Sequence, residues 1–168
     1  MFPGNKTMFL IERNYLQKLI DVIGTPDIKV ITGVRRSGKS KLLDAFFDYI
    51  NKLENNVIRI KLTEKKFSNL LDSEYLYRYV DEPYVTNTTN YLLIDEIQLC
   101  NGFETIINSL HDEERFDIYL TGSNAFLLSS DLSTLFGGRT FELNVLPFSF
   151  EEYCRYYQLN NEAFDQYF

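Results

Sequence analysis

Residues 33–40, GVRRSGKS, combine two glycines, a lysine and a serine at a spacing that could hold a phosphate group. They fit the pattern G-x-x-x-x-G-K-[ST] of phosphate-binding loops. Glycines let backbone amides turn toward a phosphate, and a helix that begins in the loop adds the positive end of its dipole. We therefore expect Lys39 to reach the β- and γ-phosphate oxygens of a nucleotide and Ser40 to offer its hydroxyl to Mg²⁺. The alternative is a glycine-rich turn that matches by accident, which average composition allows in roughly one chain in two hundred of this length.

The residues expected to surround the phosphates are the loop itself and the start of the following helix. They are Gly33, Val34, Arg35, Arg36, Ser37, Gly38, Lys39, Ser40 and Lys41. Two of them are arginines, and the sequence leaves open whether these contact phosphates, a partner chain or only water.

An acidic pair indicates what the phosphates are for. Residues 91–98, YLLIDEIQ, read as a buried strand that delivers Asp95 and Glu96 at its carboxyl end, where ligand sites of such sheets lie. Asp95 would join the Mg²⁺ ligands, and Glu96 would accept a proton from an attacking water. The alternative is a solvated acidic pair that ends a strand. Beside a phosphate-binding loop, the pair favours hydrolysis.

A third polar group follows another apolar strand, in residues 118–124, IYLTGSN. Thr121, Ser123 and Asn124 are suited to orient a water or to contact the γ-phosphate. The same residue types are also common in plain turns, which is the alternative.

Strands alternate with helices along the chain, which predicts a three-layer α/β fold with a parallel sheet. β-branched or apolar runs predict strands, and apolar residues at helical spacing predict helices. The expected strands are residues 27–33, 56–62, 91–97, 116–124 and 140–148, and the expected helices are 10–23, 40–53, 67–80, 103–113 and 149–157. The phosphate-binding motif therefore falls between a strand and a helix, which is the context it needs.

Composition limits the possible classes of protein. The chain has 168 residues, of which 45% are hydrophobic, and it carries a net charge of −7. The length and the hydrophobic fraction suit one domain with a packed core. The negative net charge disfavours tight nucleic-acid binding by this segment alone. No apolar run approaches the roughly 20 residues of a membrane-spanning helix, so we expect no membrane partner and a cytoplasmic location. Cys100 and Cys154 lie far apart and lack metal-site spacing, so both are expected to be ordinary thiols.

Together the stretches TGVRRSGKS, YLLIDEIQ, YLTGSN, LFGGRTFEL and LPFSFEEY resemble, in this order, prokaryotic AAA-type P-loop ATPases of the AAA+ superfamily. The subgroup that they resemble has a C-terminal domain of unknown function after its ATPase core. The resemblance implies a five-stranded parallel sheet in the order 5-1-4-3-2 and Mg²⁺-dependent ATP hydrolysis. It also implies that residues 33–40 are the Walker A loop, that Asp95 and Glu96 are Walker B, and that Asn124 or Ser123 is the sensor.

The resemblance also draws attention to Arg139, which lies just before the last expected strand. AAA-type ATPases commonly place an arginine finger there, and it completes the site of a neighbouring subunit. A homo-oligomer with Arg139 acting in trans is one reading, a structural ion pair or cap is another, and a contact within the same chain is a third. The single histidine, His111, is expected to be a helix-end cation and not a catalytic base.

We expect one AAA-type core domain over residues 1–168, with a lead-in helix in 1–26 and the P-loop core in 27–157. The chain ends shortly after LPFSFEEY, so the family's C-terminal domain is expected to be missing. Three other functions would use a phosphate-binding loop of this kind. A GTPase would need D-x-x-G and N-K-x-D motifs that are absent, and a small-molecule kinase would usually lack the Glu96 base. An ATP-binding assembly switch with negligible turnover stays open, and the client, whether protein or nucleic acid, is not indicated.

Overall fold

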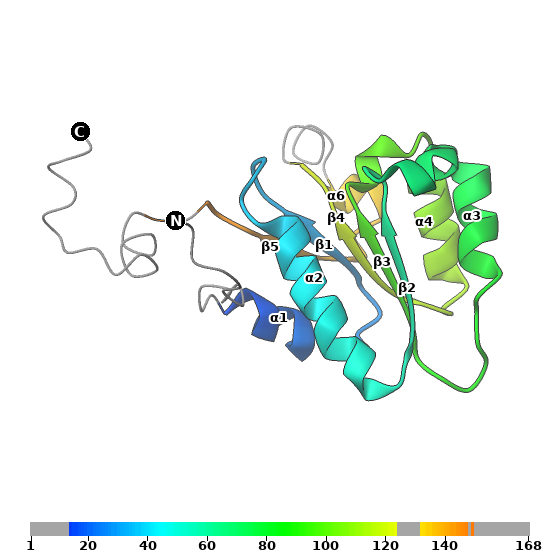
Figure 1. Cartoon of the computed structure of the whole chain (residues 1–168), viewed down its shortest axis with the longest axis horizontal. Helices are drawn as coiled ribbons and strands as arrows, with labels where there is room; N and C mark the ends of the chain where they lie inside the picture. Colours follow the sequence, from blue (N-terminus) through cyan, green and yellow to red (C-terminus); the bar gives the residue numbers. More distant parts are fainter. Residues whose placement is uncertain (1–13, 124–131, 148, 150–168) are drawn as a thin grey trace, which may run out of the picture.

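Five parallel strands form one sheet at the centre of the molecule (Figure 1). The computed structural model describes residues 14–123, 132–147 and 149. The strands are β1 (Ile28–Thr32), β2 (Asn56–Lys61), β3 (Asn90–Asp95), β4 (Asp117–Thr121) and β5 (Thr140–Asn144). Their order is β2-β3-β4-β1-β5, and every neighbouring pair is parallel. The α/β class and the predicted strand order 5-1-4-3-2 are confirmed.

Helices cover both faces of this sheet (Figure 1). Helices α1 (Tyr15–Asp21) and α2 (Lys39–Ile50) lie on one face, and α3 (Ser73–Asp81) and α4 (Phe103–Asp112) lie on the other. The shorter elements are the 3-10 helices η1 (Asn51–Leu53), η2 (Lys65–Leu71) and η3 (Ile97–Leu99), and helix α6 (Leu132–Leu135). Within the described ranges, no helix combines the length and the apolar character that crossing a membrane would require.

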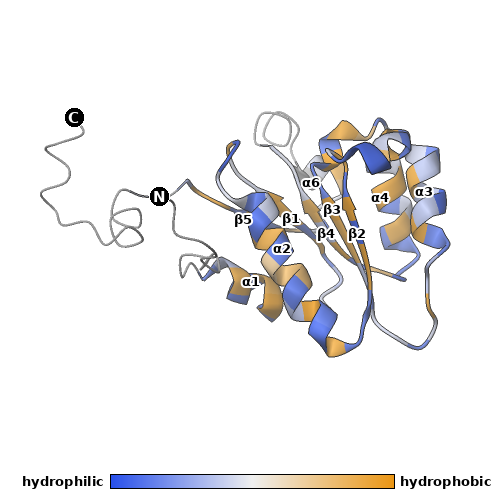
Figure 2. Ribbon diagram, viewed as in Figure 1, coloured by the Kyte–Doolittle hydropathy of each residue, from blue (hydrophilic) through white to orange (hydrophobic). Residues whose placement is uncertain are grey.

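The alternation of side chains along each strand divides the core into two layers. In β3, Leu92 and Ile94 pack toward α3 and α4, whereas Tyr91 and Leu93 pack toward α1 and α2. All six residues of β3 are buried, as expected for a strand covered on both faces. Figure 2 shows the corresponding pattern, with hydrophobic strands inside and helices whose polar surfaces face outward.

The region of residues 67–80 differs from its prediction as a single helix. It is divided into η2 and α3, because Asp72 begins a new helix as its N-cap. The Asp72 carboxylate accepts hydrogen bonds from the amides of Glu74 and Tyr75 at 3.0 and 3.4 Å. The amide of Asn101 donates to the carbonyl of Leu71 at 2.8 Å, which ties this break to the segment before α4. The expected helix over 10–23 is described only from residue 14 on, and the expected helix over 149–157 lies almost wholly outside the described residues.

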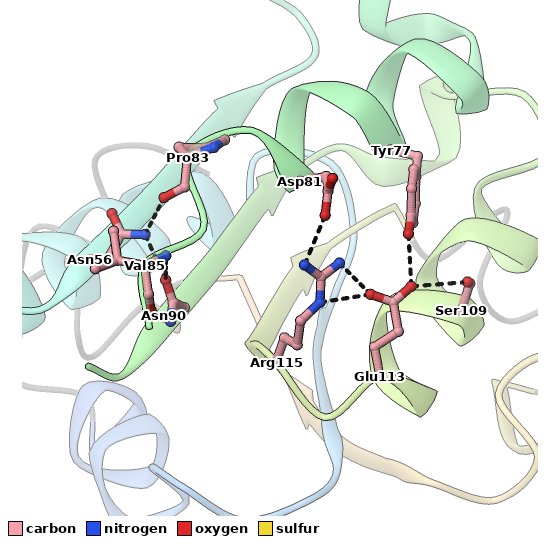
Figure 3. Close-up of polar contacts among 9 residues, drawn as sticks. All are labelled: Asn56, Tyr77, Asp81, Pro83, Val85, Asn90, Ser109, Glu113 and Arg115. Carbon is pink, nitrogen blue, oxygen red and sulfur yellow. Dashed lines mark hydrogen bonds and ion pairs between the residues drawn. The ribbon is translucent and has the colours of Figure 1, made fainter. Parts of the chain in front are cut away.

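A polar cluster joins α3 to the end of α4 (Figure 3). The Glu113 carboxylate accepts hydrogen bonds from Tyr77 and from the guanidinium of Arg115, which also pairs with Asp81 at 2.8 Å. The hydrogen bond to Glu113 raises the pKa of the Tyr77 hydroxyl, because it favours the protonated phenol. This cluster fixes the packing of the two helices on their face of the sheet.

The turn before β3 is organised by one buried amide, as Figure 3 also shows. Asn90 accepts from the amide of Val85 at 3.0 Å and from the Asn56 amide group at 2.7 Å, and it donates to the Val85 carbonyl at 2.7 Å. Asn90 and Asn56 begin their strands. The cluster therefore holds the amino ends of β2 and β3, leaving their carboxyl ends for a site.

Candidate functional site: the loop after β1 and the carboxyl ends of β3 and β4

The GVRRSGKS motif forms the loop between β1 and α2, at the carboxyl end of β1. Both of its glycines are required by geometry. A Cβ on Gly33 would lie 2.3 Å from the carbonyl oxygen of Val145, so the loop passes against the chain after β5. Gly38 has a φ of +104°, a conformation that favours glycine, and it immediately precedes α2.

Lys39 is buried within this loop and is held by it. Its ammonium donates to the carbonyl oxygens of Gly33 and Val34 at 2.9 and 3.1 Å. Within the loop, the amide of Ser37 donates to the carbonyl of Val34 at 3.1 Å, and the amide of Leu42 donates to the carbonyl of Gly38 at 2.9 Å, where α2 begins. A glycine-containing loop that holds one ammonium at the start of a helix is suited to bind an anion.

The strand period explains how Asp95 reaches this loop. Tyr91, Leu93 and Asp95 share the face of β3 that α2 covers, and Ser40 lies at the start of α2. The Ser40 hydroxyl donates to Oδ1 of Asp95 at 2.9 Å. The predicted Mg²⁺ ligands are therefore neighbours, and both supply oxygen atoms. This fits Mg²⁺, which is usually held by few protein oxygens together with water and phosphate.

Thr121, at the end of β4, connects the two acidic residues. Its buried hydroxyl donates to Oδ1 of Asp95 at 2.5 Å and accepts a hydrogen bond from the backbone amide of Glu96 at 3.0 Å. The sequence had suggested that Thr121 orients a water or contacts the γ-phosphate. In the structure it holds Asp95 and the peptide of Glu96 instead.

Glu96 follows β3 in the left-handed conformation, with φ +60° and ψ +50°. This conformation is uncommon for a residue other than glycine. The Glu96 side chain is half-buried, and its Oε2 accepts a hydrogen bond from the side-chain amide of Gln98 at 2.5 Å. The sequence reading gave Gln98 no role, although it stands two residues after Glu96 in the same motif.

The other predicted binding residues surround these groups. Ser37 is buried, and its hydroxyl has no hydrogen-bond partner among the described residues. Val34, Arg35, Arg36 and Lys41 are exposed on the loop and the first turn of α2. Ser123 is half-buried just beyond β4, whereas Asn124 lies outside the described residues, so its sensor role stays a prediction.

Arg139 does not lie with this group. It immediately precedes β5, whose first residue pairs with Ile28, and its carbonyl accepts from the Ile28 amide at 2.9 Å. The phosphate-binding loop follows Thr32 at the opposite end of β1, about 13 Å further along the strand. Arg139 therefore lies at the opposite end of β1 from the phosphate-binding loop, and a contact between Arg139 and a nucleotide, in the same chain or in a neighbouring one, stays a prediction.

Arg139 instead pairs with Asp112 at the end of α4, with Nη1 2.5 Å from Oδ1. The hydrogen bond from Arg139 lowers the pKa of the Asp112 carboxyl below its ordinary value. The neighbouring His111 lies in the last turn of α4, with Nε2 2.7 Å from the carbonyl oxygen of Pro26. His111 is remote from Asp95 and Glu96 and lies, like Arg139, near the amino end of β1.

Comparisons with known proteins identify the family. A family model described as "AAA domain" matches residues 25–154. The chain therefore belongs to the AAA-domain family of proteins. The finer subgroup, with its C-terminal domain, stays a prediction.

Two relatives are much longer than this chain, which matches only part of each of them. An uncharacterized protein of Haemophilus influenzae is 37% identical over 154 residues, which are 89% of this chain and 38% of the relative. An uncharacterized protein of Methanocaldococcus jannaschii is 34% identical over 134 residues, 79% of this chain and 29% of the relative. The chain thus spans less than two fifths of the length of these relatives.

Solved structures share the fold at low sequence identity. DnaA from Aquifex aeolicus with bound AMPPCP superposes with a TM-score of 0.60 at 20% identity, over 91% of this chain and 53% of DnaA. RIF2 of Saccharomyces cerevisiae gives a TM-score of 0.58 at 12% identity, over 88% of this chain and 60% of RIF2. At these identities the likeness shows the fold alone.

Proposed function

We propose that this AAA-domain chain binds ATP with Mg²⁺ at the loop after β1 and hydrolyses the bond to the γ-phosphate. The observation that carries the proposal is the 2.9 Å contact between Ser40 and Asp95, which joins the phosphate-binding loop to the acidic end of β3. Adenine specificity rests on family membership and on the AMPPCP bound by the DnaA neighbours, because no residue of the phosphate-binding loop or of the acidic pair is assigned to reading the base.

Each residue of the site has a distinct task in this proposal. The backbone amides of the loop and the Lys39 ammonium bind the phosphates, which requires Lys39 to exchange its contacts with Gly33 and Val34 for phosphate oxygens. Ser40 and Asp95 would hold Mg²⁺. When bound, the ion neutralises charge on the phosphates. Glu96 accepts a proton from the water that attacks the γ-phosphate.

Nucleotide binding is the first step that this proposal requires. Lys39→Ala removes the ammonium that faces the phosphates, so it should weaken Mg²⁺-ATP binding by about tenfold or more. Lys52→Ala is the matched control, because Lys52 is an exposed lysine beyond the far end of α2. Titration of a fluorescent ATP analogue measures both affinities. Equal binding by the wild type and Lys39→Ala would contradict the proposed site.

A further inference from the structure

The backbone around Glu96 is held on both sides of the residue. Its amide donates to Thr121, and its carbonyl accepts from the amide of Leu99 at 3.0 Å. The residue lies between the end of β3 and the start of η3, in the left-handed conformation. The main chain is therefore fixed, and the direction of the carboxylate depends on its side-chain contacts.

One side chain of the described part of the protein makes a hydrogen bond to that carboxylate. Nε2 of Gln98 lies 2.5 Å from Oε2 of Glu96. An ionised carboxylate only accepts hydrogen bonds, so the NH₂ group of Gln98 must face it, and a hydrogen bond to a charged acceptor is stronger than a neutral one. Oε1 of Gln98 is buried and has no partner among the described residues. The carboxamide is thus anchored by Glu96 and by no other described side chain.

We propose that Gln98 is a positioning residue for Glu96, an inference that rests on the proposed hydrolysis at this site. By binding Oε2, Gln98 restricts the rotation of the carboxylate and leaves Oε1 to receive a water. In the reaction, the water oxygen bonds to the γ-phosphorus while the bond between that phosphorus and the bridging oxygen breaks. ADP leaves with the electron pair, and the water proton passes to Oε1 of Glu96.

The kinetic test uses a substitution that keeps the shape of Gln98 and removes its donor. Gln98→Glu places a second carboxylate where the NH₂ group stood, so Glu96 loses the bond that orients it. We expect the kcat of Gln98→Glu to be about tenfold or more below that of the wild type, with KM for ATP changed by less than about twofold. Gln98→Ala should have the same effect on kcat.

A matched control exists in α1, where the side-chain amide of Gln17 donates to Asp21 at 2.8 Å on the exposed surface. Gln17→Glu changes the same group and the same charge away from the site, and it should leave kcat and KM unchanged. An unchanged kcat in both Gln98 variants, or a loss that appears only in KM, would overturn the proposal.

A second measurement does not depend on turnover. In a ¹H–¹⁵N spectrum of the full chain, the side-chain NH₂ signals of Gln98 should shift and exchange faster with solvent in Glu96→Ala, whereas those of Gln17 should not change. Unchanged Gln98 signals would overturn the positioning role whatever the activity. If these signals respond as expected but the wild type releases no more phosphate than Lys39→Ala, the contact is real and the proposed hydrolysis fails instead.

Discussion

At the scale of single residues, the candidate site depends on oxygen atoms held close together by short contacts. Ser40 and Thr121 both donate to the same atom, Oδ1 of Asp95. Such hydrogen bonds to a charged group are among the stronger ones in proteins, and a buried carboxylate that loses a donor is destabilised. Asp95 is 4% exposed, so its direction is set by these two hydroxyls.

Thr121 therefore offers a direct test of how Asp95 is held. Thr121→Val keeps the shape but removes the hydroxyl that donates to Asp95 and accepts from the amide of Glu96. We expect kcat for ATP to fall by about tenfold or more, and the Mg²⁺ concentration needed for half-maximal activity to rise. Thr121→Ser keeps the hydroxyl and should stay close to the wild type. Equal activity of the valine and serine variants would show that the hydroxyl has no such role.

Cys100 gives a pH-dependent prediction outside the site. Burial raises the pKa of its thiol from 9.0 to about 11. The folded state therefore holds the proton more tightly than the unfolded state, so the resulting stabilisation is fully present below pH 9 and is lost as the pH rises toward 11. At pH 10 the loss amounts to about 1 kcal/mol.

Chemical denaturation of the wild type and of Cys100→Ala tests this prediction, because alanine has no proton to lose. The free energy of unfolding of the wild type should fall more between pH 8 and pH 10 than that of Cys100→Ala. A parallel decline in both proteins would mean that the thiol is not shielded as its burial indicates.

At the scale of elements, a buried ion pair joins two neighbouring strands, β1 and β4, near their amino ends. Lys29 in β1 contacts Asp117 in β4 at 2.6 Å, with side chains only 1% and 6% exposed. The same carboxylate accepts the amide of Gly24 at 2.9 Å, and Lys29 donates to the carbonyl of Thr25 at 2.6 Å. The pair therefore ties the turn after α1 to the central strands.

Removal of one partner should be costly because it leaves the other charge buried. Asp117→Ala should lower the free energy of unfolding by about 3–5 kcal/mol. Glu64→Ala is the comparison, since Glu64 pairs with Lys66 on the open surface at a similar distance of 2.9 Å. That variant should be indistinguishable from the wild type in denaturant unfolding. A small effect of Asp117→Ala would indicate that water replaces the lost carboxylate.

The elements also show what the sequence could predict and why. Hydrophobic periodicity predicted each of the five strands, and the motif of residues 33–40 placed the phosphate-binding loop between β1 and α2. The strand order came from the family resemblance, because periodicity does not record which strands are neighbours. The break at Asp72 was missed since the helical period continues across residues 67–80, and the neighbour Asn101 comes from a distant part of the chain.

Within the site, the predicted approach of Ser40 to Asp95 followed from the motifs. The contact between Gln98 and Glu96 could not be predicted, because it depends on the left-handed turn of Glu96, which no pattern of residue types specifies. The buried Lys29 was also missed, since a charged residue at a core position of a strand goes against the usual alternation.

At the scale of the whole molecule, the two ends of the parallel strands carry different chemistry. The carboxyl ends of the strands hold the candidate nucleotide site, whereas Arg139 lies with Asp112 at the amino ends of β1 and β5. An arginine placed away from its own site could serve the site of a second copy, which is the trans reading of the sequence. The structure also provides the competing structural role, because the ion pair with Asp112 joins α4 to the start of β5.

Turnover at different protein concentrations separates these two roles. We propose that the rate of phosphate release per protomer rises with concentration in the wild type, and that Arg139→Ala removes this rise by withholding charge stabilisation from the neighbouring site. Arg78→Ala, which changes an exposed arginine on α3, should behave as the wild type. If Arg139→Ala lowers stability but leaves the concentration dependence intact, its role is structural and confined to one chain.

The measurement that tests the central claim most directly is phosphate release from Mg²⁺-ATP by the wild type and by Glu96→Gln, with Lys39→Ala as the blank. Glu96→Gln keeps the size of the side chain but removes the base that accepts the water proton. We predict release by the wild type well above the blank, and release by Glu96→Gln near the blank although it still binds ATP. Release by Glu96→Gln equal to that of the wild type, or binding by the wild type with no release above the blank, would contradict hydrolysis at this site, and the second result would favour an ATP-binding assembly switch.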